Sequence, residues 1–212
     1  MEFSGNVGSR ETSGVRSREL RQSLWVRGDR RLFSSMKRNL SLSKVYGLLE
    51  PGPVVLVTTA HKGQVNIMTL SWLTMMEFEP PLVGMVLSEA NFSFAALKAS
   101  KECVINIPTV ELADKVVGCG NTTGRTLDKF AEFGLTARPA RYVAPPLIDE
   151  CYVNLECRVS DTRLVTRYNF FILEVLKAWI DPTRKQPRTL HHQGKGRFVV
   201  DGKTIMLPSH KK

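Results

Sequence analysis

From Pro51 onward, the chain consists of short β-branched and apolar runs that turn residues and prolines interrupt at close intervals. PVVLVTTA (53–60) is the first run, HKGQ supplies a Gly-containing turn, and VNIMTLSW (65–72) follows as the second arm of a hairpin. Further strands are expected at LVGMVLS (82–88) and at ECVINIP, which ends at Pro108. Strands exceed helices without regular βαβ alternation, and this pattern predicts a mainly β fold.

The remaining segments predict a few helices around these strands. NFSFAALKAS has Asn91 and Ser93 ahead of a helix-favouring run, and either side chain can cap it. Two short helices, each with Thr near its start and Gly at its end, are expected at TVELADKVVG and TLDKFAEFG, with the loop GNTTGR between them. YVNLECRVSDTRL and NFFILEVLKAWI are longer strands, and the second is expected to be more fully buried. Together the segments predict an antiparallel β-barrel with peripheral helices, because closure of the sheet removes vulnerable edges.

Charge is concentrated at the two ends of the chain. The length of 212 residues and the apolar content of 42% suit one globular domain. The formal net charge is +10. Residues 1–35 hold seven Arg and four acids, and residues 184–212 hold eight Lys or Arg and one Asp, which leaves a neutral middle. Two interpretations remain open: solvated basic ends, or a nucleic-acid or anionic-surface binding module that acts through its charged termini.

The first 35 residues differ in composition from the rest. They are rich in Ser, Arg and Gly and lack apolar periodicity, so we expect a disordered basic extension at 1–35 and a folded domain at 36–212. The extension lacks the apolar core of a secretory signal, and no run in the chain approaches the roughly 20 apolar residues of a membrane span. These features favour a cytoplasmic protein.

The four cysteines form no CxxC pair and have no zinc-ligand spacing, so no metal site is predicted. Cys103, Cys151 and Cys157 lie in strand-like segments and are expected to be buried as free thiols, which fits a reducing cytosol. Cys119, between two glycines, is expected to be the exposed thiol.

Polar residues interrupt the second strand. In NIMTLSW, alternation places Met68, Leu70 and Trp72 on one face and Thr69 and Ser71 on the other. A buried hydroxyl without a partner costs about 1 to 3 kcal/mol, so these hydroxyls imply either cross-strand bonds or a polar ligand. Motifs of the GxSxG, P-loop, HExxH and GxGxxG types are missing, so the catalytic residues are unknown from sequence.

Taken in order, the segments resemble the flavin reductase-like family of FMN-binding split barrels, and most closely the flavoredoxins. The matching pieces cover most of residues 45–207: PGPVVLVTTA, NIMTLSW, the PP before the third strand, NFSFAALK, VINIP, CGNTTGRTLDKFAEFGL, LECRV and TLHHQGKGRFVVDGKTI. The resemblance implies an FMN-binding oxidoreductase on a split barrel. It would act as a flavin reductase or as a flavoredoxin-like electron carrier, and as a homodimer.

The resemblance also implies which residues bind the cofactor. Asn66, Thr69 and Trp72 would contact the flavin with the backbone of Ile67 and Met68, Ser93 and Lys129 would bind its phosphate, and Phe198 would lie near the ring. Purely structural roles are the alternatives: Trp72 and Phe198 as core, Ser93 as a helix cap, Lys129 as a solvated charge. NADH or NADPH as a transient electron donor, and a redox partner protein, are compatible with this reading.

One position departs from the family pattern. Flavoredoxin-like members often carry a His near the start of the last long strand, where this chain has Arg167, Tyr168 and Asn169. Tyr168 or Asn169 would then supply the hydrogen bond, or the substrate side of the pocket differs. The identity of the electron donor and acceptor is therefore left open by the sequence.

Overall fold

The structure is a computed structural model, and it describes residues 52–205 and residue 207. The expected extension at 1–35 lies outside the described residues, as do residues 36–51 that follow it. The strands are β1 (Gly52–Pro53), β2 (Val55–His61), β3 (Gln64–Leu70), β4 (Leu73–Phe78), β5 (Pro81–Val86), β6 (Glu102–Ile107), β7 (Ala137–Arg138), β8 (Leu147–Ile148), β9 (Val153–Asp161), β10 (Phe170–Ile180), β11 (Leu190–His192) and β12 (Phe198–Val200).

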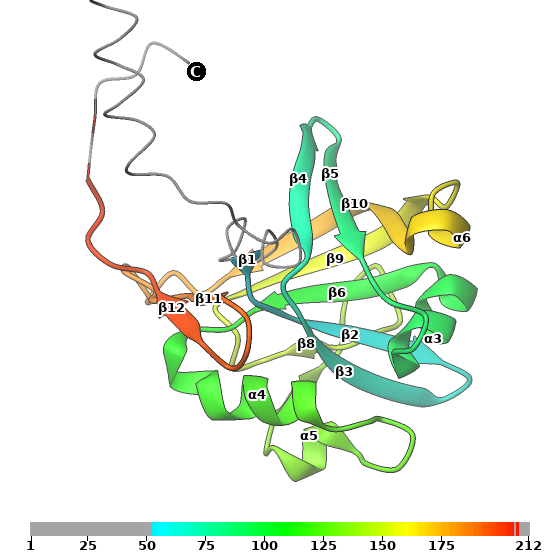
Figure 1. Ribbon diagram of the computed structural model, residues 1–212, viewed down its shortest axis with the longest axis horizontal. Coiled ribbons are helices and arrows are strands. Elements are labelled where there is room, and N and C mark those ends of the chain that lie inside the picture. Colours follow the sequence, from blue (N-terminus) through cyan, green and yellow to red (C-terminus); the bar gives the residue numbers. More distant parts are fainter. Residues whose placement is uncertain (1–51, 206, 208–212) are drawn as a thin grey trace, which may run out of the picture. The chain divides into compact units, whose positions relative to one another are not determined.

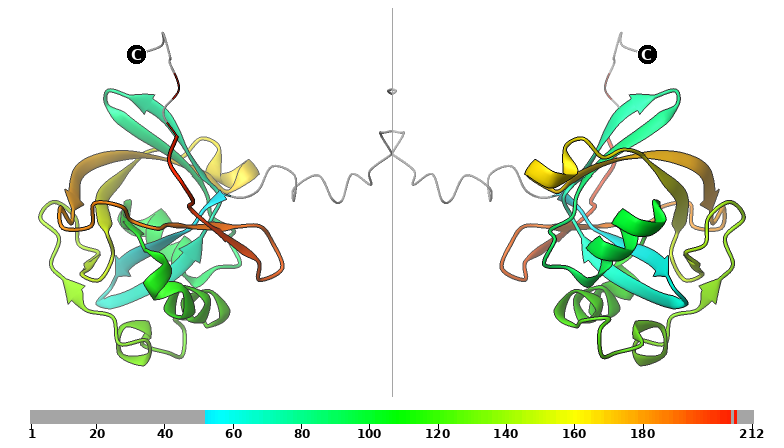
Figure 2. Two further views of the ribbon diagram at one scale, coloured as in Figure 1. Left: turned by 90° about the vertical axis from the view of Figure 1, so that its left-hand side faces the viewer. Right: turned by 90° about the vertical axis from the view of Figure 1, so that its right-hand side faces the viewer.

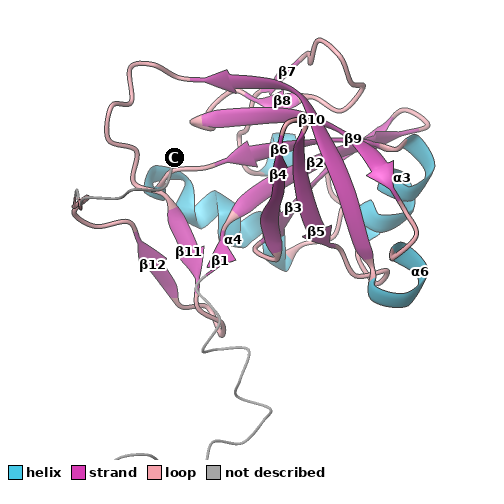
Figure 3. Cartoon of the chain, turned by 90° about the horizontal axis from the view of Figure 1, so that it is seen from above, coloured by secondary structure: helices cyan, strands magenta, loops and turns pink. Residues whose placement is uncertain are grey.

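Most strands belong to one seven-stranded sheet with the order β3-β2-β6-β9-β10-β5-β4. Every pairing within it is antiparallel, and the sheet curls around a core (Figure 1). Strands dominate the described part of the chain, and the helices lie around them (Figure 3). The mainly β split-barrel fold expected from the sequence is confirmed.

Turn chemistry builds the first hairpin as expected. Lys62 and Gly63 both have positive φ angles, of 50° and 77°, and they join β2 to β3 in a two-residue loop. Turns with two positive φ angles match the right-handed twist of the flanking strands, and glycine adopts such angles without strain. This turn pairs His61 with Gln64 and so sets the register that places Thr59 opposite Asn66.

The hairpin of β2 and β3 is buried on both faces. Met68 and Leu70 belong to the cluster inside the barrel, where they pack with Val55 and Val57. Ile67 points to the other face and belongs to a second cluster with residues of the helix that covers the barrel. The alternation expected for Met68 and Leu70 is confirmed, but β3 ends at Leu70, so Trp72 lies outside this strand.

The helices are α3 (Phe92–Ser100), the 3-10 helix η2 (Val110–Leu112), α4 (Ala113–Asn121), α5 (Lys129–Glu132) and α6 (Val165–Tyr168). Asn91 is the N-cap of α3 but its side chain makes no capping bond, and Ser93 lies inside the first turn. Asp128, and not a threonine, caps α5 by accepting bonds from the N–H groups of Phe130 and Ala131. Thr109 is the N-cap of η2, which leads directly into α4, although its side chain makes no capping bond. Thr126 lies two residues before the Asp128 cap, so α5 begins later than expected.

Two other details of the strands differ from expectation. No strand was expected at the position of β4, but it pairs with β5 in a hairpin that projects from the barrel (Figures 1 and 2). Its side chains are almost all exposed, so no alternation of apolar and polar residues marks it. β10 was expected to be more fully buried than β9 because its apolar run is more continuous, but only Phe171 and Leu173 are buried and its last three residues are exposed. Such a run does not show which of its residues the fold covers.

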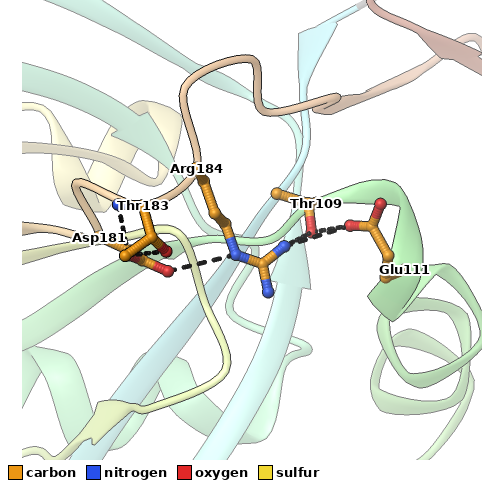
Figure 4. Close-up of polar contacts among 5 residues, drawn as sticks. All are labelled: Thr109, Glu111, Asp181, Thr183 and Arg184. Atoms are coloured by element: carbon orange, nitrogen blue, oxygen red, sulfur yellow. Dashed lines mark hydrogen bonds and ion pairs between the residues drawn. The ribbon is translucent and has the colours of Figure 1, made fainter.

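A second sheet, of order β1-β11-β12, carries the C-terminal hairpin at the side of the barrel (Figure 1). A polar cluster fixes the connection that leads into it (Figure 4). Arg184 pairs with Asp181 at 3.4 Å and with Glu111 at 3.4 Å, and it also donates to Thr109. These contacts tie the segment after β10 to the start of η2.

No helix among the described residues is long and apolar enough to cross a membrane.

Candidate functional site

A small polar cavity lies where β3, the start of α3, the end of α4 and the loop before α5 meet. Its volume is about 140 Å³. Asn66, Met68, Thr69, Ala90, Asn91, Phe92, Ser93, Cys119, Gly120, Thr122, Thr123, Gly124 and Lys129 line it. Five of the residues expected to bind a cofactor thus meet at one place, although they come from three separate segments of the sequence.

Ser93 is fully buried in the first turn of α3, at the positive end of the helix dipole. Its hydroxyl oxygen accepts a bond of 2.8 Å from Asn66 Nδ2 and one of 3.2 Å from Thr59 Oγ1. A hydroxyl oxygen has two lone pairs, and both are engaged here. The proton of Ser93 is therefore available to a ligand in the cavity, and the plain role of a helix cap does not describe this residue.

One polar atom of the Asn66 side chain has no partner among the described residues. Its Oδ1 atom is buried and has no hydrogen-bond partner among the described residues, while its Nδ2 is used by Ser93. Gly124 passes so close that a Cβ there would lie 2.0 Å from this oxygen. A buried acceptor without a donor is costly, so its presence at a cavity indicates that a ligand or water completes it.

Lys129 is buried, with 4% of its surface exposed, and is not the solvated charge that the sequence alone allowed. Its Nζ donates to the carbonyl oxygen of Cys119 at 2.6 Å. Within the described part of the chain, no carboxylate lies within ion-pair distance of it. Burial lowers the pKa of Lys129, which the nearby Cys119 only partly opposes. The ammonium group thus lacks a counter-ion.

Cys119 was expected to be exposed, and this is wrong. It is buried because α4 continues through it to Asn121 and packs it against the cluster that contains Ile67. Burial raises the pKa of its thiol to about 11, although Lys129 and Lys115 act to lower it. The thiol is therefore protonated at neutral pH and makes a poor nucleophile. The other three cysteines are buried and free, as expected.

A second cavity of about 340 Å³ adjoins the first and shares Thr69 and Gly120 with it. Val116 and Val117 of α4 line one side, and the C-terminal hairpin contributes His192 and Phe198. The Phe198 ring lies 5.3 Å from the His192 ring. Thr69 Oγ1 donates to the carbonyl oxygen of Val116 at 2.6 Å, so this strand hydroxyl has a protein partner. Ser71 also lines this cavity.

Three of the expected site residues lie outside these two cavities. Ile67 packs against α4, and only its backbone was expected to take part. Trp72 is 56% exposed at the base of the β4–β5 hairpin, so it is not a core residue, and Tyr168 is 55% exposed at the end of α6. Their roles toward a ligand stay predictions.

Sequence reasoning missed Thr59 and the loop residues Thr122, Thr123 and Gly124. Thr59 is fully buried and lies opposite Asn66 in the hairpin register. A Thr next to another Thr in a β-branched run looks like ordinary strand composition, and only the register reveals the convergence of Thr59 and Asn66 on Ser93. No group of three or more potential metal ligands occurs among the residues that the structure describes.

Comparison with known proteins places these features in a family. The flavin reductase like domain matches residues 48–199. Escherichia coli YddH, an uncharacterized protein, is 30% identical over 172 residues, covering 74% of this chain and 91% of YddH. An FMN-binding domain of a flavin reductase-like enzyme from Shewanella baltica superposes with a TM-score of 0.68 at 26% identity, covering 80% of this chain and 96% of that one.

Flavoredoxin of Desulfovibrio vulgaris has the same fold, with a TM-score of 0.69 at 21% identity and coverage of 81% of this chain and 94% of that chain. The domain match spans both cavities and the whole seven-stranded sheet. This chain belongs to the flavin reductase-like domain family.

Proposed function

We propose that this chain binds FMN and uses it in oxidation and reduction. The observation that carries the proposal is Lys129, a buried cation for which the described residues offer no anion. A buried charge is stable only when it is paired or hydrogen-bonded, so a site of this kind is suited to an anionic ligand. The names of the Shewanella and Desulfovibrio relatives support a flavin as that ligand.

The residues of the small cavity fit a phosphate group. Ser93 would donate its hydroxyl proton, the N-terminus of α3 would contribute its dipole, and Lys129 would contribute its charge. A phosphate dianion in this cavity would attract the ammonium of Lys129 and so oppose the lowering of its pKa by burial. Asn66 Oδ1 needs a donor, which a hydroxyl of the ribityl chain would supply.

The second cavity fits the flavin ring. It adjoins the small cavity at Thr69 and Gly120, so one molecule would reach both. Val117 and Phe198 would cover the apolar ring, and the polar groups of Ser71 and Asn121 would meet its pyrimidine edge. When bound, FMN would supply the redox chemistry itself, which explains why this sequence needs no catalytic motif. The protein would bind it, orient it and limit its contact with water.

Two reactions are compatible with this site: reduction of flavin by NADH or NADPH, and electron transfer to a partner protein. Purified protein should be yellow and should quench the fluorescence of added FMN. If it then oxidises NADH or NADPH in the presence of free FMN, it is a reductase. A protein that binds FMN but oxidises neither nicotinamide is not such a reductase, and electron transfer to a partner protein is then the remaining proposal. Protein that fails to bind FMN contradicts the whole proposal.

We further propose that the protein forms a homodimer through the β4–β5 hairpin. β4 is an edge strand of the seven-stranded sheet, and Met75, Met76 and Phe78 expose 57%, 45% and 89% of their surfaces there. An apolar edge strand invites pairing with another chain. The hairpin begins at Leu73, two residues after Ser71, so a second copy would lie beside the ring cavity. Sedimentation should give a dimer, and Phe78→Lys should shift it toward monomer; a monomeric wild type contradicts this proposal.

A further inference from the structure

A third cavity lies on the outer side of the phosphate-sized one. Its volume is about 510 Å³, and it shares Gly124 with the small cavity. Val65, Leu127 and Phe130 give it apolar walls, and Arg125 and Asp128 give it charge. The two cavities thus lie on either side of the loop that carries Gly124.

Two side chains meet across this boundary. Phe92, the first residue of α3, lines the small cavity, and Arg125 lines the outer one. The guanidinium carbon of Arg125 lies 5.5 Å from the centre of the Phe92 ring, within the range of a cation–π contact. Arg125 is exposed, and among the described residues it has no carboxylate at ion-pair distance. Its charge is therefore open to a ligand.

We propose that the Arg125–Phe92 stack is a gate that makes this site select flavin mononucleotide over flavin dinucleotide. The inference rests on the proposed FMN site. It adds a preference for FMN over FAD, which FMN binding alone does not imply. With the stack closed, the small cavity accommodates a terminal phosphate. A dinucleotide would have to open the stack and carry its second phosphate past Gly124, so that its adenosine enters the outer cavity.

The charge of the phosphate group favours the mononucleotide, as the shape of the small cavity does. A terminal phosphate monoester carries close to two negative charges at neutral pH, whereas each phosphate of a dinucleotide linkage carries one. Lys129 alone neutralises half of a dianion, and Arg125 at the rim would neutralise the rest. Arg125 therefore favours the mononucleotide through both its charge and its stacking.

The test measures the affinities of FMN, FAD and riboflavin for the full-length protein by fluorescence quenching at fixed salt. Arg125→Ala should weaken FMN binding about threefold to tenfold, the range expected for an exposed charge-assisted contact, and should leave riboflavin unchanged. FAD should lose less or gain, so the ratio of FMN affinity to FAD affinity should fall. Phe92→Leu, which keeps the charge but removes the stack, should also lower that preference.

Arg141→Ala is the matched control, because Arg141 stacks on Tyr142 at 5.4 Å and is likewise exposed, but lines none of the three cavities. It should leave all three affinities unchanged. An unaltered ratio of FMN to FAD affinity in Arg125→Ala overturns the gate while leaving the FMN site intact. Wild-type protein that binds no flavin overturns the proposed function as well, so the two failures are distinguishable.

Discussion

Two buried charged side chains in this protein differ in how fully the protein satisfies them with hydrogen bonds. Glu156 of β9 is fully buried, and its carboxylate accepts bonds from the backbone N–H groups of Arg141 and Tyr142 and from Trp179 Nε1 at 2.7 Å. Lys129 is buried as well, but among residues 52–205 its ammonium donates only to the carbonyl oxygen of Cys119. The first charge is satisfied by the protein itself, whereas the second is left incomplete at a cavity.

The pKa values of the two groups reflect this difference. Burial acts to raise the pKa of Glu156, but the bonds from Trp179 and the backbone outweigh it and hold the pKa below its usual value. Burial lowers the pKa of Lys129, and nothing outweighs it. A buried charge that the protein satisfies has a structural role, and one that it leaves unsatisfied next to a cavity is suited to a ligand.

The largest effect is expected at the satisfied charge. Glu156→Gln should lower the free energy of unfolding by about 2 to 3 kcal/mol, because the amide turns one acceptor into a donor that faces other donors. Chemical denaturation of the flavin-free protein measures this. A stable Glu156→Gln variant would show that the loop at 139–147 does not depend on this carboxylate.

In the cavity beside Lys129, we expect a change of shape to affect FMN affinity more than the stability of the fold. Gly124→Ala would place a Cβ 2.0 Å from Asn66 Oδ1, so the loop or the asparagine must shift. We expect FMN binding to weaken about tenfold, equivalent to roughly 1.4 kcal/mol. Fluorescence quenching by FMN gives this affinity. Gly202→Ala adds the same Cβ at a position where no other atom lies within 4 Å, and it is the matched control.

Removal of Lys129 should have little effect on stability, in contrast with removal of Glu156. Lys129→Met keeps the apolar stem and gives up one hydrogen bond together with an unpaired buried charge. The free energy of unfolding of the flavin-free protein should change by less than about 1 kcal/mol, because these two losses oppose one another. A loss as large as that of Glu156→Gln would mean that Lys129 holds α4 and α5 together.

The smallest effect is a dependence of stability on pH. The pKa of Lys129 is lowered in the folded protein, whereas an unfolded lysine titrates near about 10.4. Between these two values the unfolded chain holds a proton that the folded protein has released, so the free energy of unfolding should rise with pH in that window. Denaturation of wild type and Lys129→Met across alkaline pH measures the difference. Identical curves would contradict an uncompensated Lys129.

The sequence predicted the β2–β3 hairpin better than the cavity around Lys129, for physical reasons. The β2–β3 hairpin was predictable because Lys62–Gly63 and the β-branched runs act locally. The burial of Lys129 was not, because DKF reads as a solvated charge until α4 is known to continue through Cys119 and cover it. The resemblance to a family predicted Ser93 and Asn66 as cofactor-binding residues, but the convergence of Thr59 on Ser93 depends on strand register. β4 was missed because both of its faces are exposed.

The most direct test of the central claim compares FMN with riboflavin, which lacks the phosphate. Isothermal titration of both ligands into wild type and Lys129→Met separates the phosphate from the ring. FMN should bind the variant about tenfold to a hundredfold more weakly than it binds wild type, as expected for loss of a charge-assisted hydrogen bond, and riboflavin should bind both proteins equally. An equal affinity of FMN for both proteins, or an equal loss of both ligands, would contradict the assignment of Lys129 to the flavin phosphate.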